Sequence, residues 1–151
     1  MRIRAGLAVA FTTFALAACG SGDSDEAEAG WLLVLQGTVA AVGDGTLSLA
    51  TGSELLAFTD RPQRLVEYWS VETLIDAWDE GGDFAASPPN AVIVDETDEQ
   101  TTVVEILDAS LDADTITFTY ATLEGAPPAL GDTIAVTIDA APTSVNGQVT
   151  D

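Results

Sequence analysis

Two closely spaced arginines are the side chains of this sequence best suited to hold an anion. The chain has four basic residues, no histidine and 25 acidic residues. Arg61 and Arg64 stand three positions apart on either side of Pro62, in the run Asp60-Arg61-Pro62-Gln63-Arg64. A guanidinium binds a carboxylate or a phosphate through paired hydrogen bonds. The pair therefore predicts either a structural clasp or a binding spot for an anion.

The two interpretations of the arginine pair differ in their partners. In a clasp, the guanidiniums bind nearby carboxylates, such as those of Asp60, Glu67, Asp79 and Asp83, and pin a loop against a helix. The clasp is favoured, because an arginine is hard to keep unpaired among so many acids. In a binding spot, the pair holds an anionic small molecule or the end of an anionic polymer. Asn90 fits both, since its side chain could bond to the backbone of the Asp60 corner.

The other reactive side chains exclude several kinds of chemistry. Without histidine or lysine, the chain lacks the usual base for a serine nucleophile and the amine for a Schiff base. Zinc is a poor fit, because the chain has no imidazole and only one thiol, that of Cys19. Oxygen ligands for calcium are present in two acidic turns, over 95–99 and 108–114, but neither follows the spacing of a known calcium loop. We therefore predict a non-enzymatic protein without metal or cofactor, and keep an acidic turn as an alternative site for a divalent cation.

The N-terminal segment predicts export and a lipid anchor. A basic start with Arg2 and Arg4 precedes an apolar stretch over 5–15, which is too short to span a membrane. The run that follows, Leu16-Ala17-Ala18-Cys19, resembles the lipobox of bacterial lipoproteins. This resemblance implies a signal peptide over 1–18 and a lipid on Cys19, the single cysteine of the chain. The alternative is ordinary signal cleavage beside an incidental cysteine.

The mature chain is expected to be a tethered, strongly acidic domain of the cell envelope. Residues 19–30 are small and acidic, which is typical of a flexible tether. All 25 acids follow the leader, so nucleic acid is a poor partner. The bilayer at Cys19 is the predicted partner, with an envelope protein or a glycan as a further one. We place the protein on the periplasmic side of a bacterial membrane or on the cell surface. The lysine-free composition resembles that of proteins from salt-loving organisms.

The elements that must position the arginines are mainly β-strands. Apolar and threonine-rich stretches alternate over 31–140 and are separated by turn residues, which is typical of antiparallel strands. We predict about seven strands, at 31–42, 46–51, 54–59, 91–96, 101–107, 115–123 and 133–138. Such strands suggest a compact antiparallel β-sandwich or a partly open barrel. Residues 141–151 read as a loose tail.

One short helix is expected after the third strand. Ser70 is a suitable N-cap, and Val71, Leu74, Ile75 and Trp78 share one apolar helix face. Gly81 and Gly82 end this helix. Residues 84–90 are predicted to be an extended loop because of Pro88 and Pro89.

Residues 58–91 resemble a group of small, secreted bacterial proteins of uncharacterised function. The shared pattern is an aromatic residue, an Asp-Arg-Pro-x-Arg corner, a tryptophan in a helix, and a phenylalanine before Pro-Pro-Asn-Ala. In this sequence these are Phe58, residues 60–64, Trp78, Phe84 and residues 88–91. The resemblance implies a domain type only. Together with the leader and the lack of catalytic residue types, it leads us to expect a non-catalytic cell-envelope lipoprotein that acts as a structural or binding module. The alternative is an anion- or cation-binding domain.

Overall fold

The computed structural model describes residues 30–59 and 64–140 of the chain. The predicted signal peptide, most of the predicted tether, residues 60–63 and the C-terminal tail lie outside the described residues. The strands are β1 (Trp31–Gly43), β2 (Thr46–Thr51), β3 (Glu54–Thr59), β4 (Val66–Ser70), β5 (Asn90–Asp95), β6 (Gln100–Asp112), β7 (Thr115–Glu124) and β8 (Thr133–Ala140). A helical segment follows β4, with α1 (Val71–Ile75), the 3₁₀ turn η1 (Asp76–Trp78) and α2 (Asp83–Ala86). No helix among the described residues is long and apolar enough to cross a membrane.

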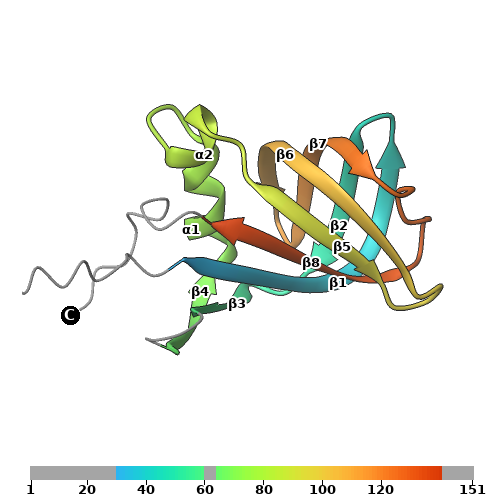
Figure 1. Ribbon diagram of the computed structural model, residues 1–151, viewed down its shortest axis with the longest axis horizontal. Coiled ribbons are helices and arrows are strands. Elements are labelled where there is room, and N and C mark those ends of the chain that lie inside the picture. The colour runs from blue at the N-terminus through green and yellow to red at the C-terminus, as the bar shows by residue number, and fades with distance from the viewer. Residues whose placement is uncertain (1–29, 60–63, 141–151) are drawn as a thin grey trace, which may run out of the picture.

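Six of the strands close into an antiparallel barrel. Their order is β2-β7-β6-β5-β8-β1, and an additional pairing of β1 with β2 completes the ring. β3 and β4 continue the sheet beyond β1 as a hairpin that projects from the barrel (Figure 1). Every strand pair is antiparallel. The predicted mainly β, antiparallel fold is confirmed, and its form is a barrel.

β1 joins the barrel to the projecting hairpin, because its two halves pair with different strands. Trp31 to Val34 pair with β3, whereas Gly37 to Gly43 pair with β2. β2 and β3 therefore lie along different halves of β1, and a notch separates them. Gly37 lies at this switch, where a β-carbon would collide with the carbonyl of Ala50.

The barrel interior is filled by alternate residues of each strand. On β7 these are Ile116, Phe118 and Tyr120, and on β8 they are Ile134, Val136 and Ile138, all of which are buried. The intervening threonines lie on the outer face, which is the alternation of an antiparallel strand with one face in the core. One hydrophobic core therefore extends through the barrel.

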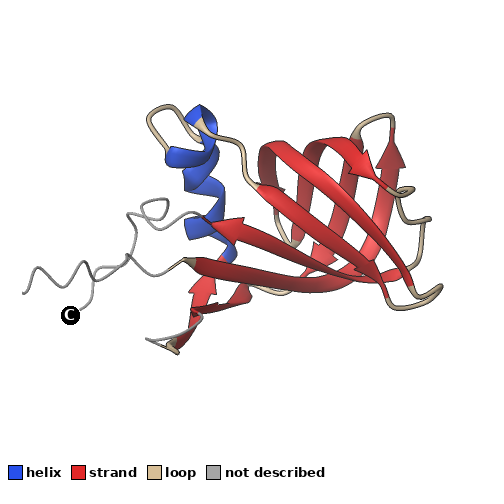
Figure 2. Ribbon diagram, in the orientation of Figure 1, coloured by secondary structure: helices blue, strands red, loops and turns tan. Residues whose placement is uncertain are grey.

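The helical segment covers one end of the barrel (Figure 2). Ser70 caps α1 as predicted, since its hydroxyl accepts a hydrogen bond from the backbone N–H of Thr73 at 3.2 Å. Trp78 is buried and donates from its ring N–H to the carbonyl of Ile106 on β6 at 3.2 Å. Its ring also packs against Phe84, with the ring centres 4.7 Å apart, and approaches Phe118 of β7. The aromatic cluster thus fastens the helical segment to the core.

Three details differ from the sequence prediction. The described residues form eight strands, because Val66–Ser70 forms the additional strand β4, and the helical segment follows the fourth strand. The predicted single helix is divided into α1 and η1, and α2 occupies part of the predicted loop over 84–90. β6 runs on to Asp112, through most of the turn predicted over 108–114. A register irregularity between Ile106 and Asp108 lets the long strand bend around the barrel.

Replacing Trp78 by alanine tests whether the helical segment is part of the core. The change removes a buried indole, so the free energy of unfolding should fall by about 3–5 kcal/mol in urea denaturation followed by circular dichroism. Leu130→Ala is the control, because Leu130 is 69% exposed, and it should change stability by less than about 0.5 kcal/mol. Equal losses in the two variants would contradict the packing of Trp78 into the barrel.

Candidate functional site

The structure places the predicted arginine site only in part. Asp60 and Arg61 lie outside the described residues, so their roles stay predictions. Arg64 is exposed in the connection between β3 and β4, with a positive φ of 50°.

The described members of the predicted site lie on separate parts of the fold. Asn90 opens β5, and β8 and β1 lie between β5 and β3 in the sheet. Asp79 and Asp83 belong to the helical segment, which the length of β4 separates from Arg64. The carboxylate of Glu67 accepts a hydrogen bond from the ring N–H of Trp69 at 2.9 Å. The register thus does not bring Asn90 beside Arg64.

An apolar surface on the projecting hairpin was not predicted from the sequence. It consists of six outward-facing residues on three adjacent strands, which we call the apolar face: Leu32, Val34, Leu56, Phe58, Val66 and Tyr68. The registers align them in two rows across the sheet, because Val34 pairs with Leu56 and Leu56 with Tyr68, and likewise Leu32 with Phe58 and Phe58 with Val66. Val66 is 66% exposed and Tyr68 is 73% exposed. The apolar face is thus most exposed to solvent along β4.

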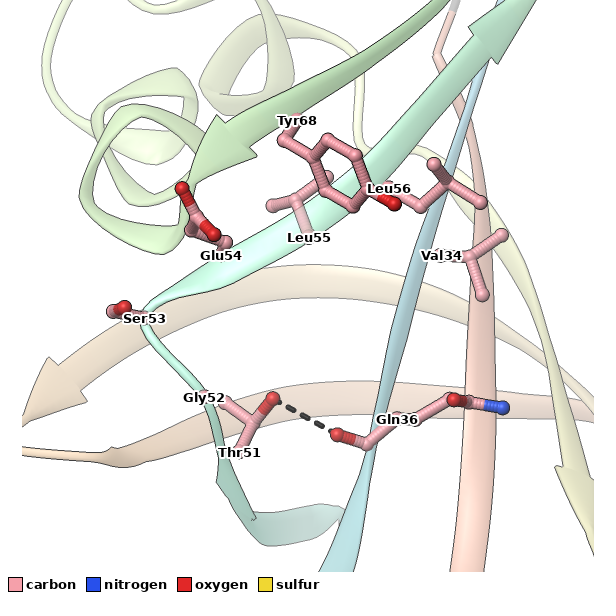
Figure 3. A pocket seen from close by; sticks show the side chains of 9 residues that line it. All are labelled: Val34, Gln36, Thr51, Gly52, Ser53, Glu54, Leu55, Leu56 and Tyr68. Carbon is pink, nitrogen blue, oxygen red and sulfur yellow. Dashed lines mark hydrogen bonds between the residues drawn. The ribbon is translucent and has the colours of Figure 1, made fainter.

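A shallow groove borders the apolar face at the notch between β2 and β3. Figure 3 shows the ring of Tyr68 beside Leu56, with Val34 beyond it. The groove has a volume of about 540 Å³ and extends to Gln36 and Thr51. The Thr51 hydroxyl donates to the carbonyl of Gln36 at 2.9 Å, which satisfies that backbone group where β1 leaves β3. The groove is therefore apolar at one end and polar at the other.

β4 also presents an open backbone edge, since it pairs only with β3 among the described strands. The N–H of Thr59 donates to the carbonyl of Leu65 at 3.0 Å, and the N–H of Val71 donates to Ser53 at 2.9 Å. Successive residues of an antiparallel strand direct their backbone groups to opposite sides. The N–H and C=O groups of Val66 and Tyr68 must therefore point to the open edge.

A second candidate site is a cluster of three aspartates at the opposite end of the barrel from the helical segment. One carboxylate oxygen from each of Asp95, Asp98 and Asp132 lies within 4.8 Å of the others. Asp95 ends β5, is only 5% exposed and accepts hydrogen bonds from the N–H groups of Thr97 at 2.8 Å and Asp98 at 3.1 Å. Asp132 accepts from the N–H of Ala129 at 2.7 Å. The cluster borders a hollow of about 210 Å³ lined by the loop before β8.

Asp95 and Asp132 have opposite pKa shifts. Burial acts to raise the pKa of Asp95, but the hydrogen bonds from the backbone of Asp98 and Thr97 outweigh it and lower this pKa. The hydrogen bond from Ala129 acts to lower the pKa of Asp132, but burial and the charges of Asp95 and Asp98 outweigh it and raise this pKa. The ionised form of Asp132 is therefore the one that the neighbouring negative charges destabilise. A divalent cation with oxygen ligands could relieve it.

The cluster contains only part of the predicted acidic turns. Asp95 and Asp98 come from the predicted turn over 95–99, whereas Glu96 contacts Gln36, 3.4 Å from its side-chain nitrogen. Asp132 was not predicted, since it joins the turn only through the pairing of β5 with β8. Among the described residues, the acids of the second predicted turn, over 108–114, form no comparable group.

Comparison with known proteins adds no assignment. No protein-family profile, curated protein or solved structure matches this chain. The resemblance of residues 58–91 to small secreted bacterial proteins accordingly stays a prediction.

Asp132→Asn tests the repulsion within the cluster. Without divalent cations, the variant should melt at a higher temperature than the wild type at pH 7, because one of three crowded charges is removed while an oxygen remains for Ala129. A raised pKa in the folded state means that wild-type stability falls as the pH rises through it. The gain should therefore shrink in acid, where Asp132 binds a proton. Asp139→Asn, at an exposed site on β8, is the control for loss of one surface charge.

The same proteins test cation binding at the cluster. Calcium at a concentration 100-fold above its dissociation constant would stabilise a binding protein by about 2.7 kcal/mol. We expect calcium to raise the melting temperature of the wild type and of Asp139→Asn, and not that of Asp132→Asn. An equal response of all three proteins, or none, would contradict a specific cation site.

Proposed function

We propose that this protein is a non-catalytic lipoprotein of the cell envelope, in which a β-barrel serves as a binding module for a protein partner. The leader and Cys19 support the lipid anchor, and the small acidic residues up to Gly30 suit a tether. The lack of histidine and lysine beyond the leader supports a binding role over catalysis. The module is thus held near a membrane, with its hairpin available for contact.

The apolar face is the single observation that carries the proposal. A half-buried antiparallel sheet normally presents polar residues to water. Here the outer face of three adjacent strands is apolar in both rows, in a chain with 25 acidic residues. Contiguous exposed apolar surface in a soluble domain marks an interaction site. The open edge of β4 beside this face would let a partner add backbone hydrogen bonds to the apolar contact.

Divalent-cation binding at Asp95, Asp98 and Asp132 is the second candidate function. It is favoured by carboxylate oxygens within 4.8 Å of one another. This cluster and the apolar face lie on different strands, so the two functions are compatible. Anion binding by Arg61 and Arg64 remains a proposal from the sequence alone.

Site-specific photo-crosslinking tests the apolar face as a contact surface. A photo-reactive phenylalanine analogue is placed at Tyr68 or at Leu130 of the full chain, and intact cells are irradiated. These positions are 73% and 69% exposed, so both are accessible, but only Tyr68 belongs to the apolar face. We expect a protein adduct of defined mass from position 68 and none from position 130. Equal labelling at both positions, or none at either, would refute the docking role.

Substitution of Cys19 tests the lipid anchor independently. The wild-type chain should be recovered in the membrane fraction of the cells, and Cys19→Ala should move to the soluble fraction or keep its leader, because no thiol remains to carry the lipid. Ser24→Ala, in the same acidic segment, is the matched control and should behave as the wild type. A membrane-bound, processed Cys19→Ala chain would contradict the anchor.

A further inference from the structure

We propose that a second copy of this chain docks on the open edge of β4, so that two barrels share one continuous sheet about a two-fold axis. This inference rests on the docking role proposed above and names its occupant.

The edge groups of β4 select the register of such a dimer. Val66, Tyr68 and Ser70 direct their N–H groups to the open edge, because Leu65 and Val71 bond towards β3. In an antiparallel pair of two β4 strands, all five residues overlap only when Tyr68 lies opposite Tyr68 of the second copy. Val66 then faces Ser70. This arrangement is isologous, since each copy uses the same residues for the contact.

The same register places the charges favourably. Glu67 faces Trp69 of the second copy. If each copy shifted by one residue, Glu67 would instead face the Glu67 of the other copy, and two like charges would meet. Arg64 is the one cation within the described residues, and it lies just before β4. Glu72 is exposed and lies just beyond the other end of β4, so the antiparallel register places Arg64 and Glu72 of the second copy at the same end of the paired strands. The edge is therefore the part of the described surface where an equally acidic copy meets an opposite charge.

Docking at this edge also extends the apolar face. The rows that end at Val66 and Tyr68 would continue into the same rows of the second copy, because side chains of adjacent strands lie next to each other on one face. The two tyrosines at the axis would form a cross-strand aromatic pair. The acidic barrels would lie at opposite ends of the shared sheet, and salt would weaken the remaining repulsion between them. Association should therefore increase with ionic strength.

Disulfide trapping in the full chain tests this register. Residues opposite each other in a hydrogen-bonded antiparallel pair have Cα atoms about 5.5 Å apart, within the range of a disulfide. Under mild oxidation, Tyr68→Cys should give a species of twice the chain's mass on a non-reducing gel. Val66→Cys should give none, and Val66→Cys with Ser70→Cys should restore it. The wild type controls for Cys19. Absence of the Tyr68→Cys product, or equal products from Tyr68→Cys and Val66→Cys, would overturn the dimer.

A charge exchange provides a second test that leaves the strand unchanged. Arg64→Glu alone places like charges at both ends of the pair, as does Glu72→Arg alone. We expect each variant to be monomeric in native mass measurements, and their equimolar mixture to form the heterodimer, because every contact then joins opposite charges. Circular dichroism verifies that both variants are folded. Failure of the mixture to associate while the wild type dimerises would overturn the proposed register.

The tests separate this inference from the docking role itself. A photo-adduct at position 68 with the mass of two chains, together with the Tyr68→Cys disulfide, supports the second copy. An adduct of another mass without the disulfide overturns the dimer and leaves the docking role standing. Absence of both products refutes the docking role as well.

Discussion

The divided pairing of β1 is the constraint on which the rest of the structure depends. Its first residues form ladders with β3 and β8, and its last residues form a ladder with β2. The change of partner takes place around Gly37, where the chains come too close for a side chain. The Thr51 hydroxyl binds the carbonyl of Gln36 at 2.9 Å there, so a backbone acceptor between the diverging strands is not left unpaired. Closure of the barrel and projection of the hairpin therefore have a common cause.

A hairpin that projects from a barrel has two faces to cover, and only one is covered by the described residues. On the inner face, Trp69 packs against Trp31 with ring centres 5.0 Å apart, next to the helical segment. Glu67 shares this face, where its carboxylate is held by the Trp69 ring N–H. The outer face bears the two apolar rows. β4 thus differs from an ordinary surface strand. Its charged residue, Glu67, faces inwards beside Trp69, whereas the apolar Val66 and Tyr68 face water.

This arrangement of β4 explains why the other strands could be predicted from the sequence and β4 could not. Strands with one face in the core, such as β7, follow from their alternation of threonine with Ile116 and Phe118. β4 has no such signal, because both of its faces carry apolar residues: Trp69 lies beside Glu67 on one, and Val66 and Tyr68 lie on the other. The pairing of β5 with β8 joins segments about forty residues apart, so local patterns could not reveal that Asp132 lies beside Asp95. Arg64 was visible as one of a rare pair of cations, but its place just before β4 was not, because β4 was not predicted.

The charge of the chain also affects how an apolar face can be tolerated. With 25 acids distributed over the chain, mutual repulsion keeps copies apart wherever their acidic surfaces would meet. An apolar patch on such a protein does not cause indiscriminate association, since an approaching copy is admitted only in orientations that keep the acidic parts distant. Because the hairpin extends the sheet away from the barrel (Figure 1), the proposed pairing at β4 would keep the two acidic barrels apart. In such a dimer, the high net charge would select the orientation in which the apolar edge is buried.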